Sequence, residues 1–167
     1  LLLHVCCGPD AAIPIVDLKE KYEVIAFWYD PNIQPKKEYN KRLKAFRKVC
    51  DIEEIACYEG EYDTDIFFEV IKGLEDTPEQ GAKCIKCYEM RLIRSVKAAK
   101  DYSCTYFTTS LLMSPHKPEE KLFAQGRTLE KKYGIEFLNT PFRKNDGFNR
   151  SVEYTKKHKI FRQNYCG

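Results

Sequence analysis

The first ten residues constrain the fold of this chain more than any other stretch. Residues 1–5 form an apolar run of strand length, and the apolar spacing in residues 11–22 predicts a helix. Between them stand two adjacent thiols, a Gly-Pro break and a carboxylate: Cys6, Cys7, Gly8, Pro9 and Asp10. The thiols are therefore expected where a strand passes into a helix N-terminus, which is where open α/β sheets bind ligands.

Two neighbouring cysteines have more than one interpretation. Side chains alternate between the faces of a strand, so Cys6 and Cys7 can converge on one ligand only where the strand has ended and the chain turns. A free cysteine is more often a small buried hydrophobe, and a vicinal disulfide is strained. The pair alone favours a functional site only slightly, and a second thiol cluster would strengthen it.

Strand-like runs alternate with helical patterns along the chain. Further strands are expected over residues 23–29, 52–58, 106–112 and 135–138, and helices over 36–49, 62–74, 84–99, 118–133 and the segment from Gly147. This alternation predicts βαβ units and a doubly wound, mainly parallel α/β sheet, Rossmann-like or HUP-like. A two-helix stretch at about 63–100 is expected to form a small helical subdomain within one domain of residues 1–167.

Composition narrows the class of protein. Of 167 residues, 43% are hydrophobic and 32% charged, which is ordinary for a globular domain, and we see no apolar run long enough to cross a membrane. The eight cysteines are not spaced like a secreted disulfide framework, and no signal peptide is recognisable, so we expect a cytoplasmic protein with metal or redox chemistry. The net charge is only +3, but lysines and arginines cluster in a way that suits a phosphate backbone.

The second thiol cluster is Cys84-x-x-Cys87. Its spacing places both sulfurs on one face of the first turn of a helix, where the helix dipole, Arg91 and Arg94 are expected to lower their pKa toward thiolate. With Cys6 and Cys7 the chain offers four thiolates, enough for tetrahedral zinc or a [4Fe–4S] cluster. Adjacent cysteines favour iron–sulfur, because structural zinc sites usually use two Cys-x2–4-Cys knuckles. A thioredoxin-like redox pair is the alternative, and it leaves the N-terminal thiols unexplained.

Other polar residues are weaker candidates. Asp10 is either a hard oxygen ligand for a second ion, a proton donor, or an ordinary helix N-cap. Cys166 could reach the site as ligand or redox partner, and His116 follows a strand end as a candidate proton relay or phosphate contact. Four further residues are expected to be packed in the core: His4, Cys50, Cys57 and Cys104.

Several motifs together resemble one family. They are His4-Val5-Cys6-Cys7-Gly8-Pro9-Asp10, Asp30-Pro31-Asn32-Ile33 with Glu38-Tyr39 and Arg42, Cys84-x-x-Cys87-Tyr88-x-x-Arg91-Leu92, Thr108-Thr109-Ser110-Leu111-Leu112-x-Ser114-Pro115-His116-Lys117, and Phe142-Arg143 followed by Phe161-Arg162-Gln163-Asn164-Tyr165-Cys166-Gly167. In this order and jointly, they are similar to the epoxyqueuosine reductase QueH family. Each motif alone would be weak evidence.

The resemblance implies an iron–sulfur enzyme that reduces epoxyqueuosine in the tRNA anticodon loop to queuosine, the last step of queuosine biosynthesis, without cobalamin. It implies that Cys6, Cys7, Cys84 and Cys87 hold the cluster, and it allows an additional iron ion nearby. The partners are then tRNA and an external electron donor, not DNA or a membrane. Two departures stand out: the family's tail usually reads Cys-Gly-Cys whereas this sequence stops at Cys166-Gly167, and Asp10 occupies a position that is often cysteine.

The implied reaction needs proton donors and side chains that bind RNA. Asp10, Tyr165 or His116 could deliver a proton. Splaying a base out of a loop requires aromatic contacts and basic side chains on the backbone. Six basic residues are candidates for that contact: Arg42, Arg91, Arg94, Lys117, Arg143 and Arg162.

Two other functions remain open at this point. A PP-loop-like, nucleotide-dependent tRNA sulfur-transfer enzyme would need a Gly-rich phosphate cradle after the first strand, where this chain has only Gly8 and no Ser or Lys. A non-catalytic, zinc-stapled RNA-binding module would be colourless with stoichiometric zinc after anaerobic purification. An iron–sulfur protein would be brown and bleached by dithionite.

Overall fold

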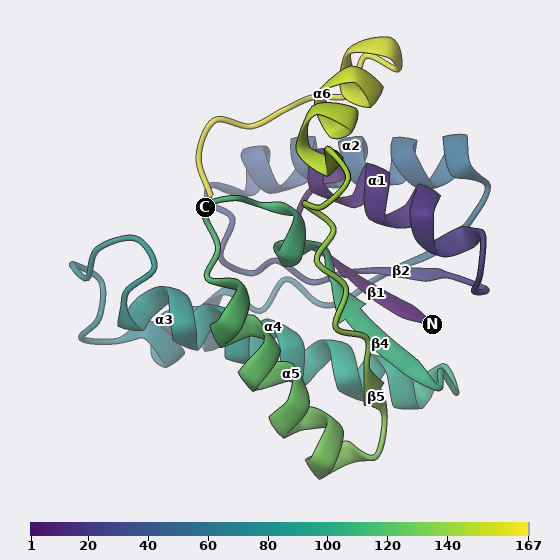
Figure 1. The fold of residues 1–167 in the computed structure, drawn as a ribbon. Helices are drawn as coiled ribbons and strands as arrows, with labels where there is room; N and C mark the ends of the chain where they lie inside the picture. The colour runs from purple at the N-terminus through teal and green to yellow at the C-terminus, as the bar shows by residue number, and fades with distance from the viewer. Residues whose placement is uncertain (167) are drawn as a thin grey trace.

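The computed structural model describes residues 1–166 and contains one parallel sheet (Figure 1). Its spatial order is β3-β2-β1-β4-β5, and every paired neighbour runs parallel. The strands are β1 (Leu2–Val5), β2 (Ile25–Trp28), β3 (Ala56–Glu59), β4 (Tyr106–Thr109) and β5 (Glu136–Phe137). The predicted doubly wound α/β fold is therefore confirmed.

Helices cover both faces of this sheet (Figure 1). On one face α1 (Gly8–Lys19) packs against α2 (Lys36–Glu53) and α6 (Gly147–Lys157). On the other, α4 (Ala82–Asp101) packs against α5 (Glu119–Tyr133), β1 and β4. The crossovers change face between β1 and β4, so the carboxyl ends of these strands form the topological switch point, where such sheets bind ligands.

The central strand is apolar because both of its faces are covered. Leu2, Leu3 and Val5 of β1 are fully buried, and Leu2 is in register with Ile25 on one side and Phe107 on the other. Helix α3 (Thr64–Ile71) contacts α4. Helix α4 also packs on β1 and β4 of the main sheet. The helical subdomain expected at about 63–100 stays a prediction.

Some predicted boundaries were wrong. The strand expected at 52–58 begins only at Ala56, because α2 continues through Glu53 and ends at Glu54 in a left-handed conformation (φ 54°). The strand expected to reach Leu112 ends at Thr109 and passes into η1 (Ser110–Met113), whose first turn is capped by the Thr109 hydroxyl accepting from the Leu111 N–H at 3.1 Å. An apolar run does not reveal such a change from strand to 3₁₀ helix.

Helix α1 begins three residues before its predicted start. Gly8 and Pro9 are its first helical residues rather than a separate turn, and the N-cap is Cys7, whose sulfur accepts from the Asp10 N–H at 3.4 Å. Asp10 is therefore not the N-cap. None of the helices in residues 1–166 combines the length and apolarity that a membrane-spanning helix needs.

We expect Gly8→Ala to destabilise the fold. A Cβ at Gly8 would lie 2.9 Å from the backbone carbonyl of Ala45 in α2, so the helices would have to separate. The cost should be about 1–3 kcal/mol in the free energy of unfolding, measured by urea denaturation.

Ala82→Gly is the matched control, because Ala82 is the first residue of α4 and is exposed. It should change stability by about 1 kcal/mol at most. A Gly8→Ala variant as stable as the wild type would contradict the close packing of α1 on α2.

Candidate active site

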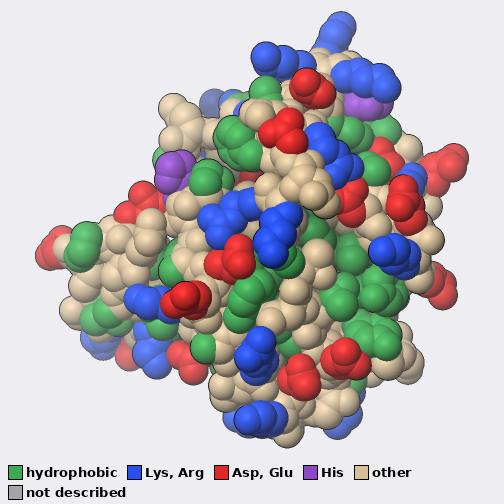
Figure 2. All heavy atoms as spheres, viewed as in Figure 1, with side chains coloured by type: hydrophobic (Ala, Val, Ile, Leu, Met, Phe, Trp, Pro, Cys, Tyr) green, Lys and Arg blue, Asp and Glu red, His purple; other side chains and the backbone are tan. Residues whose placement is uncertain are grey.

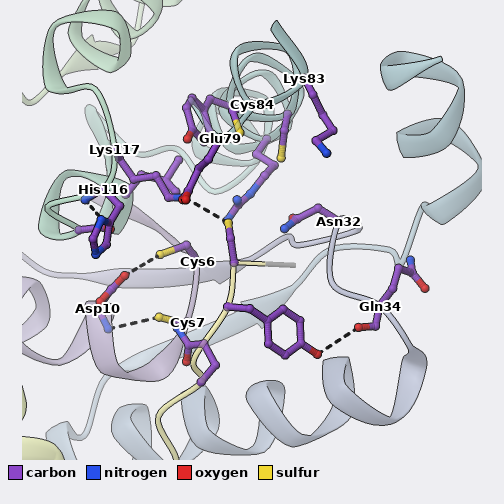
Figure 3. Close-up of a pocket in the computed structure, with 18 of the residues that line it drawn as sticks. Cys6, Cys7, Asp10, Asn32, Gln34, Glu79, Lys83, Cys84, His116 and Lys117 are labelled. Carbon is purple, nitrogen blue, oxygen red and sulfur yellow. Dashed lines mark hydrogen bonds and ion pairs between the residues drawn. The ribbon is translucent and has the colours of Figure 1, made fainter. Parts of the chain in front are cut away.

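Cysteines from the beginning, middle and end of the chain line one cavity of about 860 Å³ (Figure 3). It lies at the carboxyl ends of β1 and β4, beside the first turn of α1 and the N-terminal part of α4. All eight cysteines of the chain are free thiols. Five of them line this cavity: Cys6, Cys7, Cys84, Cys87 and Cys166.

The N-terminal pair forms a compact group with Asp10. One ligand atom from each of Cys6, Cys7 and Asp10 lies within 4.8 Å of the others. The Cys6 thiol donates to Asp10 Oδ2 at 3.5 Å, and the Ser110 hydroxyl donates to Cys6 Sγ at 3.2 Å. The Cys6 N–H in turn donates to Ser110 Oγ at 2.9 Å. Strands β1 and β4 thus hold this group from both sides.

Burial controls the protonation of this group. It raises the pKa of the Cys7 thiol well above its usual range, and the neighbouring Cys6 thiol adds to the shift. Burial also raises the pKa of Asp10, although hydrogen bonds with the two thiols and the charges of Arg162 and Lys117 oppose it. Asp10 consequently holds a proton at higher pH than an exposed aspartate does.

The second pair occupies the N-terminal part of α4. Cys84 lies in its first turn, as predicted, but Cys87 lies in the second turn, because the helix begins at Ala82. Their sulfurs face the same cavity as Cys6 and Cys7 yet lie outside the compact group described above. The expected lowering of the thiol pKa is wrong for Cys87. Burial raises it to about 11, and the charge of Arg91 only partly offsets this.

A buried ion pair stands behind Cys87. Arg91 follows it by one helical turn, and its guanidinium pairs with Asp30, which follows β2. Both side chains are about 1% exposed or less. Within residues 1–166, Arg91 Nε and Asp30 Oδ2 have no further hydrogen-bond partner. The pair therefore fixes a positive charge at the cavity wall.

The C-terminal tail crosses the cavity and is held there by side chains. Arg42 Nη1 donates to the Cys166 carbonyl at 2.6 Å, and Lys117 Nζ donates to Cys166 Sγ at 3.2 Å. The Tyr165 hydroxyl donates to the carbonyl of Gln34 at 3.3 Å. Burial disfavours the charged form of Lys117, but the neighbouring Cys166 and Tyr88 raise its pKa, so it remains an ammonium.

The basic residues proposed to contact RNA lie in different surroundings. Arg91, Lys117 and Arg162 line the cavity, and His116 lines it from an exposed position. Arg42 is buried, Arg94 lies over the Phe27 ring at 5.9 Å, and Arg143 donates to Glu119 at 2.7 Å. Their roles toward RNA stay predictions.

Two residues at the site stand in the quoted motifs but were given no role from the sequence. Asp30 and Ser110 each follow a buried strand, and that position is the signal that could have found them. The core prediction for His4 is confirmed, because its Nδ1 is hydrogen-bonded to Thr109 Oγ1 at 2.8 Å and the ring is fully buried. Cys50 and Cys104 are buried as predicted, and Cys57 is only partly buried.

A sequence profile of the family described as epoxyqueuosine reductase QueH matches residues 1–167. This chain belongs to the QueH family. Proteins named Epoxyqueuosine reductase QueH from Thermotoga maritima, Staphylococcus epidermidis and Streptococcus pyogenes are 35%, 34% and 30% identical to it. The alignments cover 100% of this chain and 87%, 74% and 68% of those proteins. The resemblance seen in the motifs is thereby confirmed over the full sequence.

In this QueH chain Arg42 should fix the tail over the cavity. We expect Arg42→Leu to raise the rate of proteolytic cleavage within residues 161–166 by about tenfold or more, because a charge-assisted hydrogen bond that holds the tail is lost. Limited proteolysis of the native protein, followed by mass spectrometry of the C-terminal peptide, measures this.

The control is Arg47→Leu, on the same helix. Arg47 is 55% exposed and pairs with Glu59 rather than with the tail. An unchanged cleavage rate in the Arg42→Leu tail would mean that the contact with Cys166 does not hold it.

Proposed function

We propose that this chain reduces epoxyqueuosine to queuosine in tRNA, by an iron–sulfur-dependent and cobalamin-independent deoxygenation. The observation that carries the proposal is the convergence of Cys6, Cys7, Cys84 and Cys87 on one cavity of a QueH-family chain. The overall reaction consumes two electrons and two protons, breaks both C–O bonds of the epoxide and releases water. A tRNA substrate also argues for a cytoplasmic location.

The cavity residues suit a [4Fe–4S] cluster. Four thiols face one space from two separate segments, which an iron–sulfur cluster can bridge because its ligands are spread over several iron atoms. The charge also suits it. Among the charged residues buried in the described part of the chain, three are cations, Arg42, Arg91 and Lys117, and one is an anion, Asp30. This excess of two positive charges would offset part of the charge of four thiolates.

Cys6, Cys7, Cys84 and Cys87 are the proposed cluster ligands. The compact group of Cys6, Cys7 and Asp10 is the alternative site for an additional iron ion, and in that case Asp10 would be a ligand instead of an acid. When bound, the centre supplies electrons one at a time, from an external donor, and an iron that acts as a Lewis acid.

Asp10 is the proposed proton donor to the departing oxygen. It lines the cavity, and burial raises its pKa, which favours the protonated form compared with an exposed carboxyl. Lys117 holds Cys166 at the same cavity, which fits a redox role for that thiol. Tyr165 is a poorer proton donor because its hydroxyl already donates to the Gln34 carbonyl. His116 lines the cavity from an exposed position and is a second candidate proton donor.

Substituting a proposed ligand should remove the cofactor. We expect Cys84→Ser to lose most of its iron and its visible absorbance, and with them the deoxygenation of epoxyqueuosine tRNA. Iron analysis after anaerobic purification and mass spectrometry of digested nucleosides measure this.

Cys57→Ser is the matched control, since Cys57 is partly buried but does not line the cavity. It should keep iron and activity. Full activity in Cys84→Ser, or a colourless wild type with stoichiometric zinc, would contradict the proposal.

Asp10→Asn should impair the proton-transfer step while the cofactor still assembles. The amide keeps the size of the side chain but cannot give up a proton, so we expect kcat to fall by about a hundredfold or more. The visible absorbance of the cluster should persist. An Asp10→Asn enzyme with wild-type kcat would exclude Asp10 as the acid, and loss of one iron per chain would indicate a ligand role instead.

A further inference from the structure

Three exposed aromatic rings surround the cavity. Phe68 is 51% exposed, Phe148 44% and Tyr165 48%, and all three line the cavity. The part of the chain that the structure describes exposes six large hydrophobic side chains, so half of them gather at this one place. Tyr58 and Tyr102, by contrast, stack on each other at 4.4 Å. Exposed apolar surface concentrated at a cavity is typical of a binding surface.

The three rings come from separate parts of the fold. Phe68 lies on α3, Phe148 on the first turn of α6 and Tyr165 in the tail. We call these three side chains the aromatic rim. They share one cavity because α3, α6 and the tail each border it.

The Tyr165 ring contacts a buried cation and is still half exposed. The Arg42 guanidinium lies 4.4 Å from its ring centroid, and the hydroxyl donates to Gln34, so the ring is fixed in place. Phe148 has a weaker cation–π neighbour in Arg162, at 5.9 Å. Fixed rings lose little entropy when another flat group stacks on them.

The charges beside the rim favour an anionic partner. Basic side chains that line the cavity outnumber acidic ones. Four lysines and arginines line it, Lys83, Arg91, Lys117 and Arg162, against three acidic residues, Asp10, Glu75 and Glu79. On the face seen in Figure 2, basic and acidic side chains are otherwise interspersed. Aromatic rings next to cations bind single-stranded nucleic acid, because bases stack on the rings and phosphates pair with the cations.

We propose that Phe68, Phe148 and Tyr165 are stacking platforms for the bases of a single-stranded RNA loop, flanking the nucleotide that enters the cavity. This inference rests on the proposed function and adds to it the residues that hold the loop open. It assigns Tyr165 a binding role through its ring, in place of proton delivery through its hydroxyl.

The test uses the full chain, loaded anaerobically with iron and sulfide, and a synthetic RNA stem–loop with 2-aminopurine in the loop and guanosine at the position of the modified base. The variants are Phe68→Leu, Phe148→Leu and Tyr165→Leu. Each should raise the Kd for the stem–loop by about tenfold or more and reduce the quenching of 2-aminopurine fluorescence that stacking causes. Tyr165→Phe keeps the ring and should bind like the wild type.

Two controls separate stacking from charge and from folding. Tyr58→Leu removes an exposed aromatic ring away from the cavity and should leave Kd unchanged. The leucine variants should keep the wild-type slope of log Kd against log salt concentration, whereas Lys83→Gln should make it shallower.

The outcomes distinguish this inference from the proposed function. Leucine variants that bind and quench like the wild type, or a wild type that neither binds the loop nor quenches it, would overturn the aromatic rim. A wild type that binds and quenches but never deoxygenates epoxyqueuosine tRNA would overturn the proposed function and leave the rim in place.

Discussion

The pairing of β1 with both β2 and β4 is the constraint on which the site depends. With parallel neighbours on each side, the strand is hydrogen-bonded along both edges, so a slip by one residue would break its register with β2 and with β4 at once. Its end is therefore fixed, and so are the two residues that follow it. Cys6 is held by Ser110 beyond β4, and Cys7 caps α1, so the thiol pair inherits the rigidity of the sheet.

The buried pair of Arg91 and Asp30 is better explained by function than by stability. Removing two charges from water costs several kcal/mol, and each partner here has an atom without a hydrogen-bond partner in residues 1–166. Apolar residues of similar size would fold as well. What the pair provides is a fixed cation one turn from Cys87 and close to the place where negatively charged thiolates would gather around a metal centre.

The C-terminal tail lines the cavity and is held there by side-chain hydrogen bonds. It is not part of the sheet or of a helix, and it stays in place through hydrogen bonds from Arg42, Lys117 and Tyr165. Such contacts are individually weak compared with the ladder of hydrogen bonds in a sheet, so the position of the tail depends on these few side chains.

The amino-acid sequence by itself determined the strand–helix alternation, the parallel sheet and the segments that carry the thiols, because these depend on local periodicity and on Gly and Pro. It misplaced the end of β4 and the start of β3, since a run of apolar residues is compatible with strand and with helix. Only the tertiary structure decided that Cys87 is buried with a raised pKa, that Asp30 faces Arg91, and that three aromatic rings meet at one cavity. Burial and side-chain proximity arise from contacts between residues far apart in the chain, which no local pattern records.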